Sequence, residues 1–256
     1  MDTVRPKKFL GQHFLTDLDI AKRIVNALSK DLNAVVEVGA GMGVLTQFLI
    51  PERTEKLFVV EIDDESVEFL ERHFPTLGNR LIHNDFLKTN LSDFDKDNVG
   101  VIGNFPYNIS SQIFFHILEY RDSVTEVVGM LQKEVAERLC AKPGSKTYGI
   151  LSVLLQAWYD LEYLFTVNED VFSPPPKVKS AVIRLKRNNI KELGCDETLF
   201  RQVVKMAFNQ RRKTLRNSIR PLLTPEIIGN DVFDKRPEQL SVSDFVNLTN
   251  LLTPTN

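Results

Sequence analysis

The residues best suited to chemistry are four in succession, Asn104, Phe105, Pro106 and Tyr107, at the end of an apolar run over 99–103. An asparagine oxygen and a nearby backbone carbonyl can accept the two N–H bonds of an exocyclic amine on a planar base. Accepting both localises the nitrogen lone pair, which is otherwise delocalised into the ring. Pro106 stiffens the loop, and Tyr107 offers a ring face on which a base can stack. We therefore take Asn104, Pro106 and Tyr107 as candidate catalytic residues.

The same tetrapeptide also suits a plain β-turn that carries a buried tyrosine, because Asn and Pro are common turn residues. Taken alone, it favours neither interpretation. The rest of the chain has to decide between them.

A glycine-rich turn forms a second candidate site. Residues 35–38 (VVEV) predict a short strand, and Gly39, Gly41 and Gly43 follow it before a predicted helix. Glycines allow the backbone to turn tightly and to approach a ligand closely. The spacing is G-x-G-x-G, whereas the dinucleotide fingerprint is G-x-G-x-x-G. It suits a pyrophosphate poorly and a zwitterionic methionine tail better, although a glycine turn alone is a weak signal.

Three acidic residues strengthen the prediction of a cofactor site. Glu37 lies in the first strand, Glu61 ends a second predicted strand, and Asp85 follows a third. Glu61 comes 22 residues after Gly39, close to the spacing expected for an acid that binds ribose hydroxyls, and Asp85 can accept from an adenine amino group. Ligands bind at the carboxyl ends of parallel strands, where these acids would lie. The combination favours S-adenosylmethionine as cofactor, with NAD as the alternative.

Composition limits the class of protein. The chain has 256 residues, of which 43% are hydrophobic and 26% charged, enough for one sizeable domain and a smaller one. It has no apolar run long enough to span a membrane, and its first residues lack the pattern of a signal peptide. Cys140 and Cys195 match no metal or redox spacing, and the four histidines are scattered. We expect a cytoplasmic, monomeric protein with no metal.

Charge is distributed unevenly along the chain. Residues 31–100 hold fourteen acidic and six basic side chains, whereas 177–191 hold six basic and 201–220 hold seven basic, with no acidic residue in either stretch. A solvated helix face is the ordinary explanation of a charge run. Two acid-free basic stretches favour a polyanion partner instead, despite the net charge of −2.

The pattern of elements predicts an α/β fold. Short apolar strands at 35–38, 57–62, 81–83, 99–103 and 125–131 alternate with helical patterns, as in a doubly wound, mostly parallel sheet. Residues 160–167 and 178–187 suit antiparallel strands at its edge, and beyond Asn188 the sequence becomes helical and basic. We predict a cofactor-binding catalytic domain over 1–190 and a small helical, RNA-binding domain over 191–256.

With these residues placed, the chain resembles the ribosomal RNA adenine dimethyltransferases over nearly its whole length, specifically the bacterial small-subunit type. The segments that carry the resemblance are 8–15 (KFLGQHFL), 37–43, Glu61, Asp85, 104–107, 171–178 (VFSPPPKV) and 207–217 (AFNQRRKTLRN). Two residues depart from the family pattern: Phe105 stands where Leu is usual, and Ala40 where Pro is usual. We expect changed packing with retained chemistry at the first, and a looser turn at the second.

The resemblance implies a Rossmann-like S-adenosylmethionine-dependent methyltransferase that dimethylates N6 of two adjacent adenosines near the 3′ end of 16S rRNA, in a partly assembled small subunit. It implies that His13 and Leu15 contact the cofactor, that Gln12 lies near its methionine end, and that Phe172 packs on the target base opposite Tyr107. We expect the phosphate contacts to come from Lys177, Lys179, Arg211, Arg212, Lys213 and Arg216, with Arg212 and Arg216 on one helix face.

Two alternatives stay open from sequence. A large-subunit adenine methyltransferase of the macrolide-resistance type shares the catalytic motifs, although 207–217 matches the small-subunit family. A ribosome assembly factor could use the same fold without essential catalysis.

Overall fold

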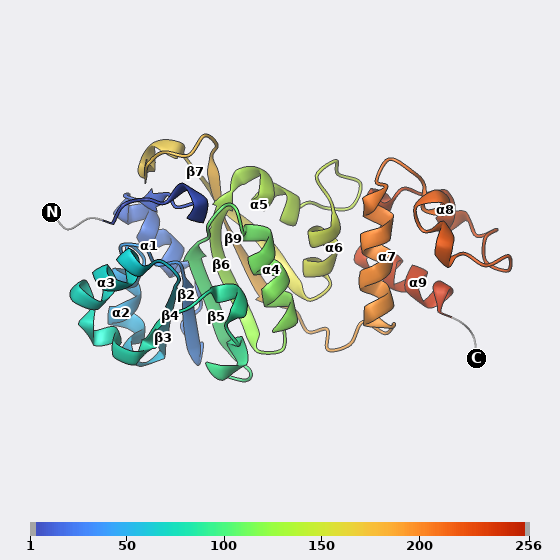
Figure 1. Ribbon diagram of the computed structural model, residues 1–256. Helices are drawn as coiled ribbons and strands as arrows, with labels where there is room; N and C mark the ends of the chain where they lie inside the picture. Colours follow the sequence, from blue (N-terminus) through green and yellow to red (C-terminus); the bar gives the residue numbers. More distant parts are fainter. Residues whose placement is uncertain (1–3, 254–256) are drawn as a thin grey trace. The chain divides into compact units, whose positions relative to one another are not determined.

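The computed structural model describes residues 4–253, and a seven-stranded sheet forms its centre (Figure 1). The order of the strands is β4-β3-β2-β5-β6-β9-β7. The pairs from β4 to β6 are parallel, and β9 pairs with β6 antiparallel. The predicted Rossmann-like sheet with an antiparallel edge is confirmed.

The strand bounds follow the apolar runs of the sequence closely. The strands are β1 (Phe14–Leu15), β2 (Ala34–Val38), β3 (Leu57–Glu61), β4 (Leu81–His83), β5 (Val99–Asn104), β6 (Val124–Gln132), β7 (Tyr159–Val167), β8 (Phe172–Ser173) and β9 (Ser180–Arg187). All five residues of β2 are buried, as expected for a parallel strand that is covered on both faces.

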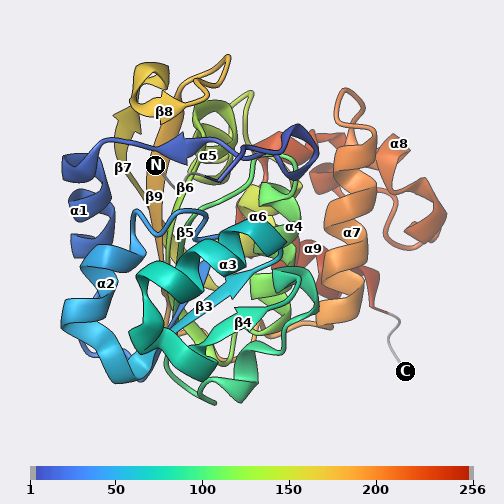
Figure 2. The same cartoon turned by 60° about the vertical axis from the view of Figure 1, so that its left-hand side comes forward.

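Helices cover the sheet on both sides. The α-helices are α1 (Leu18–Asn26), α2 (Thr46–Arg53), α3 (Asp64–His73), α4 (Ser110–Glu119), α5 (Lys133–Leu139), α6 (Ile150–Gln156), α7 (Glu197–Asn209), α8 (Leu215–Ser218) and α9 (Val242–Leu252). Figure 2 shows the sheet nearly edge-on, with α1 and α2 on one side and α4 on the other. The carboxylate of Asp17 caps α1 by accepting from the N–H groups of Asp19 and Ile20, and a capping box formed by Ser241 and Asp244 begins α9.

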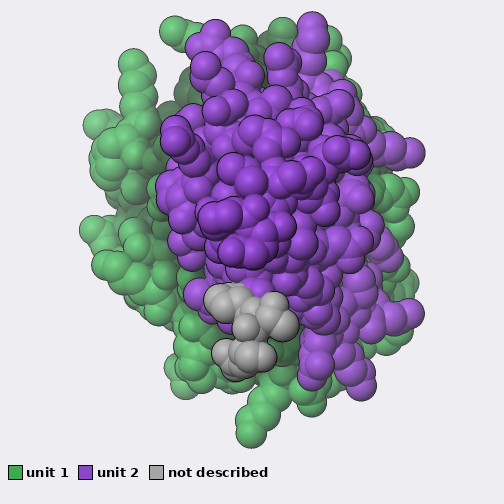
Figure 3. Space-filling model, turned by 90° about the vertical axis from the view of Figure 1, so that its right-hand side faces the viewer, with its two compact units in different colours: residues 1–136, 161–187 green, residues 137–160, 188–256 purple. Residues whose placement is uncertain are grey.

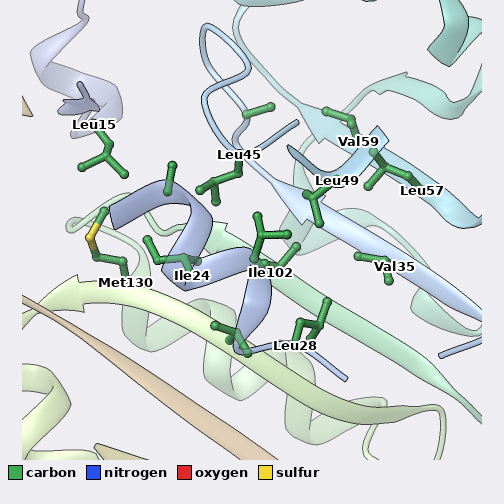
Figure 4. Packing of buried hydrophobic residues seen from close by; sticks show 14 of the residues in the cluster. Leu15, Ile24, Leu28, Val35, Leu45, Leu49, Leu57, Val59, Ile102 and Met130 are labelled. Carbon is green, nitrogen blue, oxygen red and sulfur yellow. The ribbon is translucent and has the colours of Figure 1, made fainter. Parts of the chain in front are cut away.

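Apolar side chains from α1, α2 and the strands pack together in the hydrophobic core of the first unit (Figure 4). Ile24 on α1, Leu49 on α2, Val59 on β3 and Ile102 on β5 have no exposed surface. This close packing fixes the position at which each strand ends, and therefore where the side chains that follow it lie.

A small second sheet was not predicted from the sequence. β1 pairs antiparallel with β8, so that Phe14 lies opposite Ser173 and Leu15 opposite Phe172. Two-residue strands carry too little pattern to be recognised in a sequence. Their pairing fixes the N-terminal segment beside the ends of the parallel strands.

The chain divides into two compact units (Figure 3). The first comprises residues 1–136 and 161–187, and the second comprises 137–160 and 188–256. The predicted boundary near residue 190 lies beside the change at 187/188, but 137–160 group with the C-terminal residues, which the sequence did not predict. Within this unit, α6 packs against α7 and α9, and the ring of buried Tyr148 lies 6.1 Å from that of Phe208 on α7.

Candidate active site

A cavity of about 300 Å³ lies in the first unit, at the carboxyl ends of the parallel strands. The turns after β2, β3, β4 and β5 and the residues around β1 form its walls. The predicted site residues on these walls are Gln12, His13, Gly39, Gly41, Glu61, Asp85, Asn104, Pro106 and Tyr107. The structure thus brings together residues that are separated by as many as 95 positions in the sequence.

Asn104 ends β5 and has a defined orientation. Its Nδ2 donates to the backbone oxygen of His13 at 2.8 Å. A carbonyl oxygen can only accept, so the amide nitrogen has to face His13 and the Oδ1 acceptor is turned away from it. Within residues 4–253, no hydrogen-bond donor reaches that Oδ1. The side chain therefore offers a free acceptor in a residue on the cavity wall.

Phe105 and Pro106 hold the loop after Asn104. Phe105 is 1% exposed and packs edge-on against Phe114 on α4, with ring centroids 5.8 Å apart. A methyl group on Gly129 would come within 2.4 Å of the Phe105 ring, so the absence of a side chain there makes room for the larger residue. The departure from the usual Leu thus changes the packing below the loop and leaves Asn104 on the wall.

Two contacts fix the side chain of Tyr107, one at its hydroxyl and one at its ring face. Its hydroxyl is hydrogen-bonded to Oγ of buried Ser180 on β9, and its ring stacks on the ring of His13 at 5.2 Å and 29°. His13 is itself fixed by a 2.8 Å hydrogen bond between Nδ1 and the backbone oxygen of Pro174. Burial raises the pKa of Tyr107, so the phenol stays neutral at physiological pH. The Tyr107 ring is therefore a fixed and uncharged aromatic surface in the site.

The glycine turn is tied to the second strand by Glu61. Its carboxylate accepts from the backbone N–H groups of Gly41 at 2.9 Å, Ile62 at 2.9 Å and Asp63 at 3.0 Å. Burial raises the pKa of Glu61, and these N–H bonds oppose the rise. Gly41 has a φ of +56°, and an added Cβ would lie 2.6 Å from the Phe14 ring. Only glycine fits this position.

Glu37 lies below the turn and not on the cavity wall. It is 1% exposed, and its carboxylate accepts from Oγ1 of Thr46 at 2.7 Å. Burial raises its pKa to about 8. The structure therefore gives Glu37 a supporting position under the turn, in place of the direct cofactor contact expected from sequence.

Leu15 and Phe172 also differ from expectation. They are 3% and 4% exposed, lie opposite each other in the β1–β8 pair, and belong to the hydrophobic core. The cavity walls do not include either residue. In this structure Phe172 does not face Tyr107 across the cavity. Its two-residue strand turns the ring into the core, which spacing alone could not reveal.

Gln12 belongs to a polar network that the sequence did not predict. Its Oε1 accepts from the backbone N–H of Lys7 at 2.8 Å, and its Nε2 lies 3.4 Å from the carboxylate of Asp63. Lys7 forms an ion pair with the same carboxylate. Burial alone would raise the pKa of Asp63, but hydrogen bonds from Lys7 and other side chains hold it below its usual value. This charged contact fixes the N-terminal segment beside the cavity.

Asp85 follows β4 and lines the cavity. One of its oxygens accepts from the backbone N–H of Leu87 at 3.0 Å. Within residues 4–253, the second oxygen has no hydrogen-bond donor. The carboxylate is therefore anchored by one oxygen and has the other available for a ligand.

The candidate phosphate contacts fall into two groups. Lys177 and Lys179 in the first unit and Arg212 and Lys213 in the second are exposed. Arg216 instead donates to Asp234 at 2.8 and 2.9 Å, as a solvated ion pair would. The remaining candidate, Arg211, donates to the backbone oxygen of Ser145 at 3.2 Å.

The expectation that Arg212 and Arg216 share a helix face is wrong. α7 ends at Asn209 and α8 begins at Leu215, so Arg212 lies in the turn between them. The backbone N–H of Lys213 bonds to the oxygen of Gln210 and closes that turn. The helix-favouring residues 210–213 concealed this break from sequence analysis.

Comparison with known proteins decides the family. The model of the family described as "Ribosomal RNA adenine dimethylase" matches residues 4–252. The chain belongs to that family. Among its relatives, "Ribosomal RNA small subunit methyltransferase A" of Parabacteroides distasonis is 63% identical over 253 residues, covering 97% of this chain and 94% of the relative. The protein of the same name from Cytophaga hutchinsonii is 57% identical over 256 residues, which cover 99% of this chain and 99% of the relative.

Solved structures agree on the fold. A dimethyladenosine transferase from Plasmodium falciparum superposes with a TM-score of 0.77 at 24% identity, covering 92% of this chain and 96% of that one. The 23S rRNA methyltransferase ErmE gives 0.68 at 22% identity, covering 93% and 99%. The predicted family, methyltransferase fold and rRNA adenine dimethyltransferase activity are confirmed. Within residues 4–253 there is no group of side chains that could hold a metal, and no helix suited to crossing a membrane.

Proposed function

We propose that the protein transfers methyl groups from S-adenosyl-L-methionine to N6 of two adjacent adenosines near the 3′ end of 16S rRNA, giving N6,N6-dimethyladenosines. We propose as substrate a partly assembled small ribosomal subunit, on which the enzyme acts in the cytoplasm as a monomer during ribosome biogenesis. The observation that carries the chemistry is the orientation of Asn104, whose Nδ2 is held by His13 while Oδ1 is free to accept from an amine.

The cavity residues fit S-adenosylmethionine. Gly39 has a φ of +65°, and a Cβ added there would meet nothing closer than the Pro106 ring at 3.9 Å. A gap therefore separates the glycine turn after β2 from the loop after β5. Gly39 and Gly41 would hold the methionine end near Gln12, Glu61 would bind the ribose, and Asp85 would accept from the adenine amine of the cofactor. The total volume falls at the lower end of ordinary ligand pockets.

The chain's own residues position the acceptor. When bound, the cofactor supplies an electrophilic methyl group on a sulfonium, so placement is the main contribution required of the protein. Asn104 Oδ1 and a loop carbonyl accept the two N–H bonds of the target amine and localise its lone pair. Tyr107 supports the everted base by stacking, which offsets the few kcal/mol needed to remove it from its helix. The amine loses a proton to solvent after each transfer.

Dimethylation favours an uncharged hydrogen-bond acceptor at position 104. After the first transfer one N–H is replaced by a methyl group, and the site loses one hydrogen bond. A charged carboxylate at position 104 would be left partly desolvated at that stage, whereas a neutral amide tolerates an unused acceptor more readily. We infer that this explains an asparagine at the end of β5.

Methyl transfer to isolated subunits tests this function. Small subunits that lack the modification, large subunits and each naked rRNA are incubated with labelled S-adenosylmethionine, and the nucleosides are identified by mass spectrometry. We expect label only in N6,N6-dimethyladenosine of the small subunit. Label in the large subunit would indicate a macrolide-resistance type of activity. Binding to subunits without label would indicate a non-catalytic assembly factor.

A further inference from the structure

Phe9 is an unusually exposed aromatic side chain. It is 76% exposed, more than any other large hydrophobic residue among residues 4–253. It lies in the middle of a short 3-10 turn, Lys8–Leu10, close to the N-terminus. The phenyl ring has no polar group that solvent could stabilise.

The turn that carries Phe9 is held firmly in place. The backbone oxygen of Phe9 accepts from Nδ2 of Asn108 at 3.1 Å, and the N–H of Gly11 bonds to the oxygen of Lys8 at 3.0 Å. Gly11 has a φ of +65°, and an added Cβ would lie 2.6 Å from Oδ1 of Asn108. The exposure of Phe9 therefore belongs to a defined conformation that close backbone packing imposes.

This turn borders the cavity. Leu10 and Gly11, which follow Phe9, and Asn108, which binds its backbone, all line the cavity wall. Lys8 in this turn and Arg5 three residues before it are both exposed. Within the described part of the chain, neither has an ion-pair partner. An exposed ring with unpaired cations beside a substrate cavity matches the pattern by which proteins hold single-stranded nucleic acid.

We propose that Phe9 stacks on a base of the RNA next to the adenosine held in the cavity. This inference rests on the proposed function. Eversion of the target adenosine leaves a neighbouring base without its stacking partner. The Phe9 ring replaces that partner, while Arg5 and Lys8 neutralise the adjacent phosphates. Stacking on a phenyl ring is tolerant of sequence, so Phe9 holds the opened strand without selecting the base.

Substitution separates stacking from general contact. With unmodified small subunits as substrate, Phe9→Ala is expected to lower kcat/KM about tenfold, chiefly through a higher KM for the subunit. That change corresponds to about 1.4 kcal/mol and lies within the range for base–aromatic stacking. Phe9→Tyr keeps the ring and should retain activity within twofold. Leu18→Ala removes another exposed apolar side chain, 48% exposed on α1, and should have no effect. Affinity for S-adenosylmethionine should be unchanged in all three.

A fluorescent variant identifies the partner. The chain's single tryptophan, Trp158, is 3% exposed, so Phe9→Trp adds an exposed indole whose signal is obtained by subtracting the wild-type titration. Quenching of this indole by unmodified subunits is the expected result, because a stacked base quenches it. A blue shift without quenching would assign Phe9 to a ribosomal protein and overturn the proposal, as would a Phe9→Ala enzyme of full activity. Inactive wild-type enzyme would instead refute the proposed function.

Discussion

Replacement of Asn104 by aspartate changes one atom of the site and reverses its hydrogen bonding. In the structure Nδ2 of Asn104 donates to the His13 oxygen at 2.8 Å. In Asn104→Asp this contact joins two acceptors, unless the new carboxyl group is protonated. An ordinary aspartate is ionised at neutral pH, so the side chain rotates away from His13 and the acceptor oxygen loses its fixed direction. Only a protonated carboxyl group could donate to the His13 oxygen and keep that direction.

The expected loss follows from that single contact. A typical hydrogen bond contributes about 1 kcal/mol, and leaving a buried partner unsatisfied costs about 1–3 kcal/mol. If the whole loss falls on the transition state, kcat decreases roughly 5- to 150-fold. The second transfer should suffer more than the first, because the monomethylated amine has a single N–H left for two acceptors, and a charged carboxylate tolerates the lost hydrogen bond less well than a neutral amide. We therefore expect monomethyladenosine to accumulate.

Single-turnover methylation of unmodified small subunits, with separate quantification of mono- and dimethyladenosine, measures both effects. Asn98→Asp is the matched control, because Nδ2 of Asn98 donates to the Asp31 oxygen at the same distance of 2.8 Å, outside the cavity walls. It should change stability in a similar way and leave the rate of transfer unchanged. Full dimethylation at the wild-type rate by Asn104→Asp would refute the role given to this amide.

Three further predictions concern the supporting structure. Gly41→Ala places a Cβ 2.6 Å from the Phe14 ring at a positive φ, so the Kd for S-adenosylmethionine measured by calorimetry should rise at least tenfold; unchanged affinity would show that the turn does not hold the cofactor. The pKa of Glu37 is raised to about 8, so the unfolded chain loses this proton first and stability falls as pH rises from about 4.5 to 8. Urea denaturation of Glu37→Gln should show a smaller decrease in the free energy of unfolding between pH 4.5 and 8 than wild type, by up to roughly 5 kcal/mol. The same pH dependence in both proteins would contradict the burial argument. Arg212→Ala should reduce the salt dependence of subunit binding by about one ion, whereas Arg216→Ala should reduce stability by about 1 kcal/mol; equal salt slopes for both variants would contradict the difference seen between them.

The sheet could be predicted from sequence because its strands are short apolar runs that end at polar or glycine residues. β2, β3 and β5 begin and end within about one residue of the predicted ranges. The wall residues Gly39, Glu61, Asp85 and Asn104 follow from this directly. In a parallel sheet, residues that end successive strands must meet at one edge.

The remaining features depend on contacts that spacing does not encode. The β1–β8 pair, which turns Phe172 into the core, joins two-residue strands more than 150 positions apart. The break between α7 and α8 that separates Arg212 from Arg216 begins in a run of helix-favouring residues, 210–213. No sequence motif indicated a role for Lys7, because only the fold brings it to Asp63, which lies 56 positions away in the sequence.

The most direct test is a crystal structure of the protein with S-adenosylhomocysteine and an adenosine nucleotide. We predict that the nucleotide's N6 lies within hydrogen-bond distance of Asn104 Oδ1, with its base stacked on Tyr107 and its amine directed at the sulfur. An adenosine bound elsewhere, with its N6 out of reach of Asn104 Oδ1, would contradict the account.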